Sequence, residues 1–371
     1  MRRMSDTIAR LKAAQARFAV AGAAPHSSRL SPLTEFGSNP GALRGFQYLP
    51  QGLARAAPLV VVLHGCTQTA AGYDHGAGWS RLSDQLGFAV LYPEQQRANN
   101  PNCCFNWFVP GDIGRGFGEA LSIAQMVRRM VDLHGLDRDR VFVTGLSAGG
   151  AMAAAMLAAY PEMFAAGAVI AGLPYGCAAS IPDAFDRMRG HGMPPDMRLE
   201  AHVRHASNHR GPWPRLSIWH GSADRTVSPS NMEALIGQWR GLHGLKAAEP
   251  ERSAIGPHSR RVWRDGAGTA RIEALTIAGM GHGTPIDGSD AISAPAPYSL
   301  DAGISSTRHI AQFWQLGAES GQTATAQVSA APQDEARPVR DPGAGSPQGQ
   351  GPGSGVGKVI EDALRAAGLM R

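Results

Sequence analysis

The junction between a β-rich run and an alanine-rich run constrains the fold of this chain more than any other feature. Residues 139–145, DRVFVTG, carry the β-branched residues typical of a strand, and residues 151–160, AMAAAMLAAY, have high helix propensity. Between them lies Gly145-Leu146-Ser147-Ala148-Gly149, a G-x-S-x-G pattern. A serine on so tight a turn needs neighbours without bulk, and its hydroxyl then projects from the sheet. The motif predicts a nucleophilic serine; the alternative is a glycine-rich turn with an incidental serine.

Short β-rich runs alternate with helical patterns from about residue 44 to residue 317. This alternation is typical of an α/β fold with a mostly parallel central sheet and helices on both faces. The predicted strands are residues 46–50, 58–65, 88–95, 139–145, 165–172, 215–221 and 271–279. The predicted helices are residues 78–87, 118–136, 151–160, 231–242 and 304–317.

The two ends of the chain differ in composition from residues 41–317, which form the predicted catalytic domain. Residues 1–40 predict an amphipathic helix followed by a loop rich in small residues, Gly and Pro. Residues 318–355 are rich in Gly, Pro, Ala and Ser and predict a disordered linker. Residues 356–371 return to a helical pattern, and this short helix either docks on a partner or is a frayed tail.

Charge and hydropathy patterning exclude two classes of function. The chain has 371 residues and a formal net charge of +5, but its positive residues are scattered and form no basic arm. We therefore expect no nucleic-acid partner. The longest apolar runs are strand-sized, well short of the roughly 20 residues that a membrane-spanning helix needs. We expect no membrane span.

A serine nucleophile needs a base, and the base needs an orienting carboxylate. In α/β-hydrolases these groups follow the chain order Ser, Asp or Glu, His. Asp224 follows the predicted strand 215–221, and His282 follows the predicted strand 271–279. Catalytic loops of a parallel sheet lie at these carboxyl ends. The sequence thus predicts a triad of Ser147, Asp224 and His282.

The competing histidines and carboxylates fit this order less well. His220 lies within the end of its strand and is interpreted as a packed core histidine, while His202, His205 and His209 have no strand before them. Asp287 and Asp290 follow His282, which is the wrong order.

Two backbone N–H groups should stabilise the tetrahedral oxyanion. The first belongs to Ala148, directly after the nucleophile. The second belongs to Cys66 or Thr67, in the loop that follows His64-Gly65 at the end of a predicted strand. His64 itself is interpreted as a brace for that loop.

Six segments, in order, resemble the poly(3-hydroxybutyrate) depolymerase family of serine esterases, whose relatives include feruloyl and acetylxylan esterases. They are LHGCTQTAAGYD, GWSRLSDQLGFAVLYPEQ, NCCFNWF, RVFVTGLSAGGAMAAAMLAAYPEMFAAGAVIAGLPYG, HGSADRTVSPSN and GMGHGTPI. The resemblance covers roughly residues 40–317 and implies an α/β-hydrolase fold. It implies the same triad, an oxyanion role for Cys66, and short-chain hydroxyalkanoate esters as substrates, polymeric or oligomeric. We expect no cofactor and no metal, since the four cysteines lack the C-x-x-C spacing of a zinc site.

The resemblance leaves the cellular compartment open. It implies that Cys66 pairs with Cys104, and such a bond favours an oxidising compartment. Secreted members carry a cleavable signal and often a polymer-binding module. In this chain the N-terminal segment lacks the pattern of a secretory signal, and the predicted linker is followed by the short predicted helix. Both features favour intracellular polymer granules or soluble oligomers as substrates.

Several alternatives remain beside this interpretation. Trp107, in the segment CFNWF, either contacts an apolar acyl chain or anchors a long loop in the core. The runner-up activity is that of a feruloyl or acetylxylan esterase. A non-catalytic granule- or polymer-binding protein would not need the complete triad, and a polyhydroxyalkanoate synthase would carry cysteine in place of Ser147.

Overall fold

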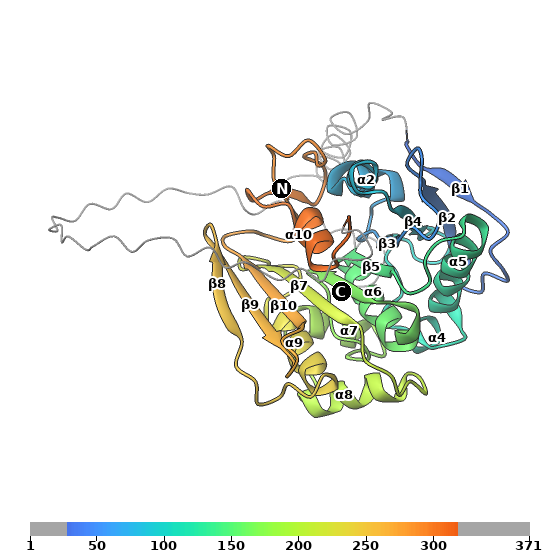
Figure 1. Cartoon of the computed structure of the whole chain (residues 1–371). Coiled ribbons are helices and arrows are strands. Elements are labelled where there is room, and N and C mark those ends of the chain that lie inside the picture. The colour runs from blue at the N-terminus through green and yellow to red at the C-terminus, as the bar shows by residue number, and fades with distance from the viewer. Residues whose placement is uncertain (1–27, 318–371) are drawn as a thin grey trace, which may run out of the picture. The chain divides into compact units, whose positions relative to one another are not determined.

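The computed structural model describes residues 28–317 of the chain (Figure 1). The amphipathic helix expected near the N-terminus, the linker 318–355 and the helix 356–371 lie outside these residues, so their predictions are untested. Within the described residues, no helix is both long and apolar enough to cross a membrane.

A ten-stranded sheet forms the centre of the described fold. Its strands, in spatial order, are β1 (Ser31–Leu33), β2 (Arg44–Tyr48), β4 (Ala89–Glu94), β3 (Leu59–Leu63), β5 (Val141–Leu146), β6 (Ala166–Ile170), β7 (Arg215–Gly221), β10 (Ala270–Ile277), β9 (His258–Arg264) and β8 (Glu251–Ile255). The six strands from β4 to β10 are parallel, and the outer pairs are antiparallel. A second sheet pairs β11 (Thr284–Ile286) with β12 (Ser299–Asp301).

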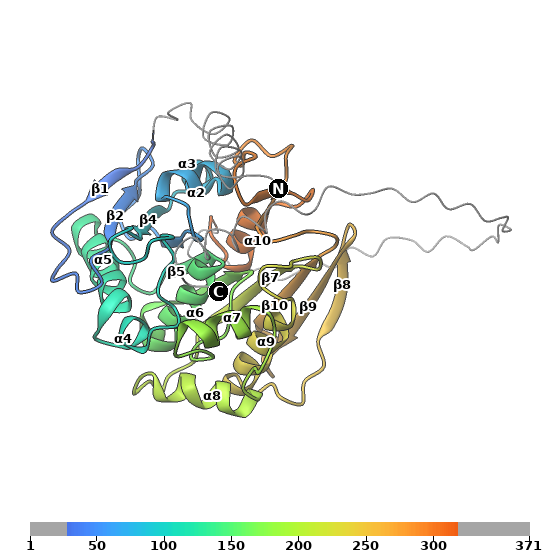
Figure 2. The ribbon, with the colours of Figure 1, turned by 180° about the vertical axis from the view of Figure 1, so that it is seen from behind.

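Helices cover both faces of the sheet, as Figures 1 and 2 show from opposite sides. Side chains of β3 alternate between two apolar cores: Leu59, Val61 and Leu63 enter one, and Val60 and Val62 enter the other. The first core is completed by α5 (Gly118–His134), α6 (Ala148–Ala159) and α9 (Ser230–Leu242). The second is completed by α2 (Ala70–Ala77), α3 (Trp79–Leu86) and α10 (Ser306–Phe313). This arrangement confirms the predicted α/β architecture.

Four further helices of the described residues lie in the connections between these elements. They are α4 (Pro110–Ile113), the 3₁₀ helix η1 (Pro161–Met163), α7 (Ile181–Met188) and α8 (Asp196–His205). The last two follow β6 and contribute Ala184 and Leu199 to a small apolar cluster that also holds Ala148 and Trp107. The connection between β6 and β7 therefore reaches the end of the sheet where Ser147 lies.

All seven predicted strands and all five predicted helices are present, with ends displaced by a few residues. The N-terminal loop prediction was incomplete, because residues 31–33 form β1 and pair with β2. Leu33 is buried while Ser31 and Pro32 are exposed, so a single core contact anchors this edge strand. The fold therefore begins before residue 41.

Candidate active site

Ser147 occupies a strained turn between β5 and α6. Its backbone has φ 58° and ψ −118°, a region that side-chain-bearing residues rarely adopt. The Ser147 N–H donates to Ile170 O of the neighbouring strand at 2.8 Å, which holds the turn against the sheet. The predicted strand, elbow and helix are thus present. A strained serine at this position is the geometry that the motif requires of a nucleophile.

Close backbone contacts explain the glycines around this serine. A Cβ on Gly145 would lie 2.3 Å from Gly149 O, and a Cβ on Gly149 would lie 2.3 Å from Leu63 O. Both distances are far shorter than any real carbon contact. The turn therefore closes only because the two flanking glycines lack side chains.

We expect Gly149→Ala to destabilise the protein by about 1–3 kcal/mol, because the new methyl group must push away the end of β3. The loop that follows β3 carries the predicted oxyanion donor, so kcat should fall as well. Gly111→Ala is the control, since a Cβ there has open space. Urea unfolding and ester hydrolysis of both variants check the prediction, which fails if the two variants behave alike.

Asp224 and His282 meet at the carboxyl ends of their strands. His282 Nδ1 lies 2.7 Å from Asp224 Oδ2, and both side chains are buried. The other oxygen of Asp224 accepts the N–H groups of Thr226 and Val227, at 2.8 and 2.9 Å. Burial alone would raise the pKa of Asp224, but hydrogen bonds from His220 and His282 outweigh it and hold this pKa well below its ordinary value. The carboxylate therefore stays ionised beside His282.

His220 has a second contact that its sequence position did not reveal. It is buried, as expected, and its Nε2 lies 2.9 Å from Val227 O and 3.4 Å from Asp224 Oδ2. Among residues 28–317, its Nδ1 finds no hydrogen-bond partner, so the proton belongs on Nε2. The side chain therefore braces the loop that presents the carboxylate. The sequence signal was only its spacing of four residues from Asp224.

Ser147 lies at the same edge of the sheet as this pair. β5, β6, β7 and β10 are adjacent and parallel, so the segments that follow them emerge together. Ser147 follows β5, Asp224 follows β7 and His282 follows β10. The structure brings Asp224 and His282 into contact. The meeting of Ser147 with His282 stays a prediction.

The predicted oxyanion loop is tied to a distant segment by a disulfide. Cys66 is bonded to Cys104, the pairing that the family resemblance implied. Thr67 N–H already donates to Asn102 O at 2.7 Å, so of the two predicted donors Cys66 N–H is the better candidate. Ala148 begins α6, and an N–H in the first turn of a helix has no acceptor within that helix.

Trp107 is buried rather than openly displayed. Only 7% of its surface is exposed, and it belongs to the apolar cluster that contains Ala148, Ala151, Leu173 and Val227. Its ring packs edge-to-face on Phe108 with centroids 5.5 Å apart. This burial fits the interpretation of Trp107 as a core anchor, and its contact with an acyl chain stays a prediction.

Glu119, at the start of α5, is a buried acid that bonds Asn106, close in sequence to the disulfide-bonded Cys104. Burial raises its pKa to about 8, although hydrogen bonds from Asn106 and Gln95 oppose the shift. Folding therefore favours the protonated form. Its contribution to the free energy of unfolding is fully present below the ordinary pKa of 4.5 and is lost as the pH rises through 8.

We expect the wild-type protein to lose stability between pH 5 and pH 8 by about 1 kcal/mol per pH unit relative to Glu119→Gln, which cannot ionise. Urea unfolding of both proteins across this range measures the difference. Parallel stability curves for the two proteins would contradict the raised pKa.

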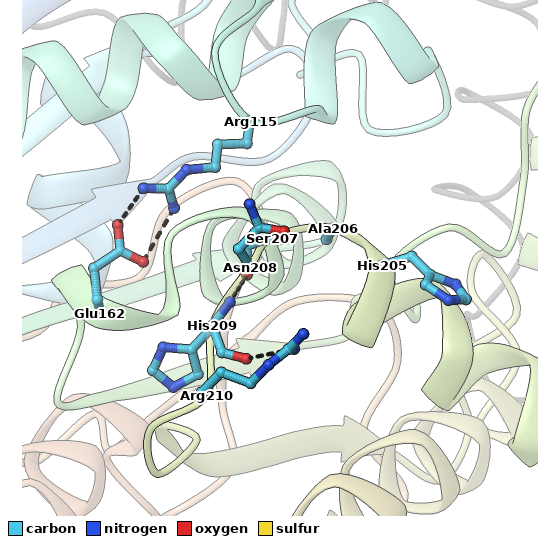
Figure 3. Close-up of a pocket in the computed structure, with 8 residues that line it drawn as sticks. All are labelled: Arg115, Glu162, His205, Ala206, Ser207, Asn208, His209 and Arg210. Carbon is cyan, nitrogen blue, oxygen red and sulfur yellow. Dashed lines mark hydrogen bonds and ion pairs between the residues drawn. The ribbon is translucent and has the colours of Figure 1, made fainter.

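A polar pocket of about 620 Å³ lies away from these residues (Figure 3). It is lined by Arg115, Glu162 and residues 205–210. Arg115 donates to Ala159 O, at the last residue of α6, whereas Ser147 precedes the first. The helix between them is about 18 Å long. The pocket is therefore not the site of the predicted chemistry. Within residues 28–317, no group of three or more metal-ligating side chains gathers.

Comparison with known proteins supports the same chemistry. Residues 43–261, more than half of the chain, match the family model described as esterase PHB depolymerase. The chain is 45% identical over 291 residues to poly(3-hydroxyalkanoate) depolymerase C of Paucimonas lemoignei, which covers 77% of this chain and 70% of that protein. It is 31% identical over 279 residues to acetylxylan esterase A of Emericella nidulans, covering 72% of this chain and 88% of that protein.

A solved structure extends the likeness to the fold. The acetyl xylan esterase from Aspergillus awamori matches with a TM-score of 0.63 and 31% identity, over 68% of this chain and 93% of that one. Its fold is that of the α/β-hydrolases. The chain therefore belongs to the esterase PHB depolymerase family and is a carboxylic ester hydrolase.

Proposed function

We propose that this esterase hydrolyses poly- or oligo-(3-hydroxyalkanoate) esters through an acyl-enzyme on Ser147. The observation that carries the substrate class is the 45% identity to a poly(3-hydroxyalkanoate) depolymerase over most of both chains. The observation that supports the chemistry is the buried contact between His282 and Asp224, at the same sheet edge as the strained serine.

In the proposed mechanism each group has a distinct role. His282 Nδ1–H donates to Asp224, which leaves Nε2 free to accept the proton of the Ser147 hydroxyl. Ser147 Oγ then bonds to the ester carbonyl carbon, and the carbonyl oxygen becomes an oxyanion that accepts the N–H groups of Ala148 and Cys66. The imidazolium returns its proton to the departing alcohol as the ester bond breaks. Water repeats the sequence on the acyl-enzyme and releases the acid.

The surroundings of the serine suit a short aliphatic acyl chain. The apolar cluster beside it contains the small side chains of Ala148, Ala151 and Ala178, with Leu173 and Val227. An acyl site bordered by this cluster favours apolar groups of modest size. Acetylxylan or feruloyl ester hydrolysis is the second candidate, favoured by the likeness to the solved acetyl xylan esterase.

Side-by-side hydrolysis of hydroxybutyrate oligomers, p-nitrophenyl butyrate, acetylated xylan and methyl ferulate tests the assignment. We expect the highest kcat/KM among the natural esters for the oligomers. A higher value for acetylated xylan or methyl ferulate would transfer the assignment to the second candidate. Docking of the helix predicted at residues 356–371 on a polymer granule belongs to the same hypothesis, and co-sedimentation of the whole chain with granules tests it.

A further inference from the structure

The peptide unit between Gly65 and Cys66 carries the N–H assigned to the oxyanion, and a buried histidine holds the other side of this unit. His64 Nδ1–H donates to Gly65 O at 2.8 Å. A peptide unit is planar and trans, so its C=O and N–H point in opposite directions. A donor that fixes the Gly65 carbonyl therefore also fixes the direction of the Cys66 N–H. By polarising the unit, it strengthens that N–H as a donor.

Gln95, directly after β4, determines which nitrogen of His64 carries the proton. The Gln95 N–H donates to His64 Nε2 at 3.1 Å, so a neutral imidazole must carry its proton on Nδ1. Burial lowers the pKa of His64 to about 4, so the ring is neutral at pH 7. The ring also packs on Phe105, with centroids 5.0 Å apart. His64 thus has one orientation and one tautomer.

Glu119 in turn holds Gln95 and the segment that carries Cys104. Glu119 Oε1 accepts from the Gln95 side-chain amide, which also donates to Cys104 O at 3.1 Å. Glu119 Oε2 accepts from Asn106 N–H at 2.9 Å. The side-chain oxygen of Gln95 accepts from the Asn99 side chain at 2.8 Å, so its amide cannot flip without losing these partners. His64, Gln95 and Glu119 are each only 1% exposed.

We infer that Glu119, Gln95 and His64 are positioning residues that set the direction of the oxyanion donor in ester hydrolysis. The hydrogen-bond chain begins on α5, runs through Gln95, which also bonds Cys104 O, and ends on the Gly65–Cys66 peptide. The Cys66–Cys104 disulfide also links the oxyanion loop to the segment that carries Cys104. Hydrogen bonds and a covalent bond therefore both hold this loop. The inference rests on the proposed function, because it requires an oxyanion to form at this loop.

Glu119→Gln tests the chain of contacts. One carboxyl oxygen becomes an NH₂ group, which cannot accept a hydrogen bond, so either the Gln95 amide or the Asn106 N–H loses its acceptor. We expect kcat for p-nitrophenyl butyrate to fall about tenfold with KM changed less than twofold, since the lost alignment matters only when the oxyanion forms. The Ki of butaneboronic acid, which forms a tetrahedral adduct, should rise by a similar factor. Reduction of the Cys66–Cys104 disulfide should lower kcat by a larger factor in this variant than in the wild type.

Glu273→Gln is the matched control, because Glu273 is an equally buried acid that bonds Ser217 and Arg260 in the sheet. We expect it to lower the melting temperature without changing kcat. An unchanged kcat in Glu119→Gln, or an equal fall in both variants, would overturn the inference. An inactive wild-type protein would count against the proposed function instead.

Imidazole ¹⁵N NMR of the wild-type protein gives a test that does not depend on any variant folding. The chain of contacts requires His64 to be the Nδ1–H tautomer at pH 7. A signal for the Nε2–H tautomer, or for an imidazolium, would overturn the inference.

Discussion

Ser147→Ala should abolish ester hydrolysis while leaving the fold intact. Without the hydroxyl no acyl-enzyme forms, and His282 and Asp224 have no proton to move. Removal of the nucleophile from a serine triad costs about 10⁶-fold in kcat and leaves about 10³–10⁴-fold over water from the oxyanion hole and binding. Stopped-flow release of p-nitrophenol should show a burst in the wild type if deacylation is slow, and none in the variant.

The matched control is Ser217→Ala, a buried serine on β7 that bonds Glu273 and Trp219 away from the strand ends. We expect this change to lower stability by about 1 kcal/mol and leave kcat within a few-fold of the wild type. The strained backbone at residue 147 also predicts that alanine there does not relieve the strain, because both side chains carry a Cβ. Full activity in Ser147→Ala would remove the nucleophile from the proposed mechanism.

Much of the fold and part of the site were predictable because they depend on local patterns. The central strands are short runs of buried β-branched residues, and Asp224 and His282 follow two of them directly. β8 and β9 were missed because most of their side chains are exposed or half-buried and give no clear alternation of apolar residues. α2 was missed because Gly72 and Gly76 weaken its helical pattern, although Thr69 caps its first turn.

The polar contacts behind the site were not predictable, because they join residues far apart in sequence. The Gln95–Glu119 bond spans 24 residues, and although Gln95 ends one of the six family-like segments, no spacing in the sequence links it to Glu119. His220 was correctly placed in the core, but its spacing of four residues from Asp224 does not by itself show that its ring faces the carboxylate. Which side chains form these contacts depends on how the interior of the folded protein packs. No periodicity or residue spacing in a single sequence shows that packing.

Asp224→Asn should lower kcat about 10⁴-fold with little change in KM. The Asp224 oxygen that accepts the N–H groups of Thr226 and Val227 must remain an oxygen, so the new amide NH₂ faces His282. His282 Nδ1 can then only accept, which moves the ring proton to Nε2. An imidazole protonated at Nε2 cannot take the proton of Ser147, so the geometry survives while the base is lost.

The control for this change is Asp290→Asn, since Asp290 was the carboxylate excluded by chain order and instead pairs with Arg308. We expect its kcat to stay within about twofold of the wild type, because a partly exposed ion pair contributes little. A reversed result, with Asp290→Asn inactive and Asp224→Asn active, would show that chain order misassigned the acid. A loss of activity in Asp224→Asn alone would show that the loop following β7 determines which nitrogen of His282 carries the proton. It would thereby show that this loop determines the reactivity of Ser147.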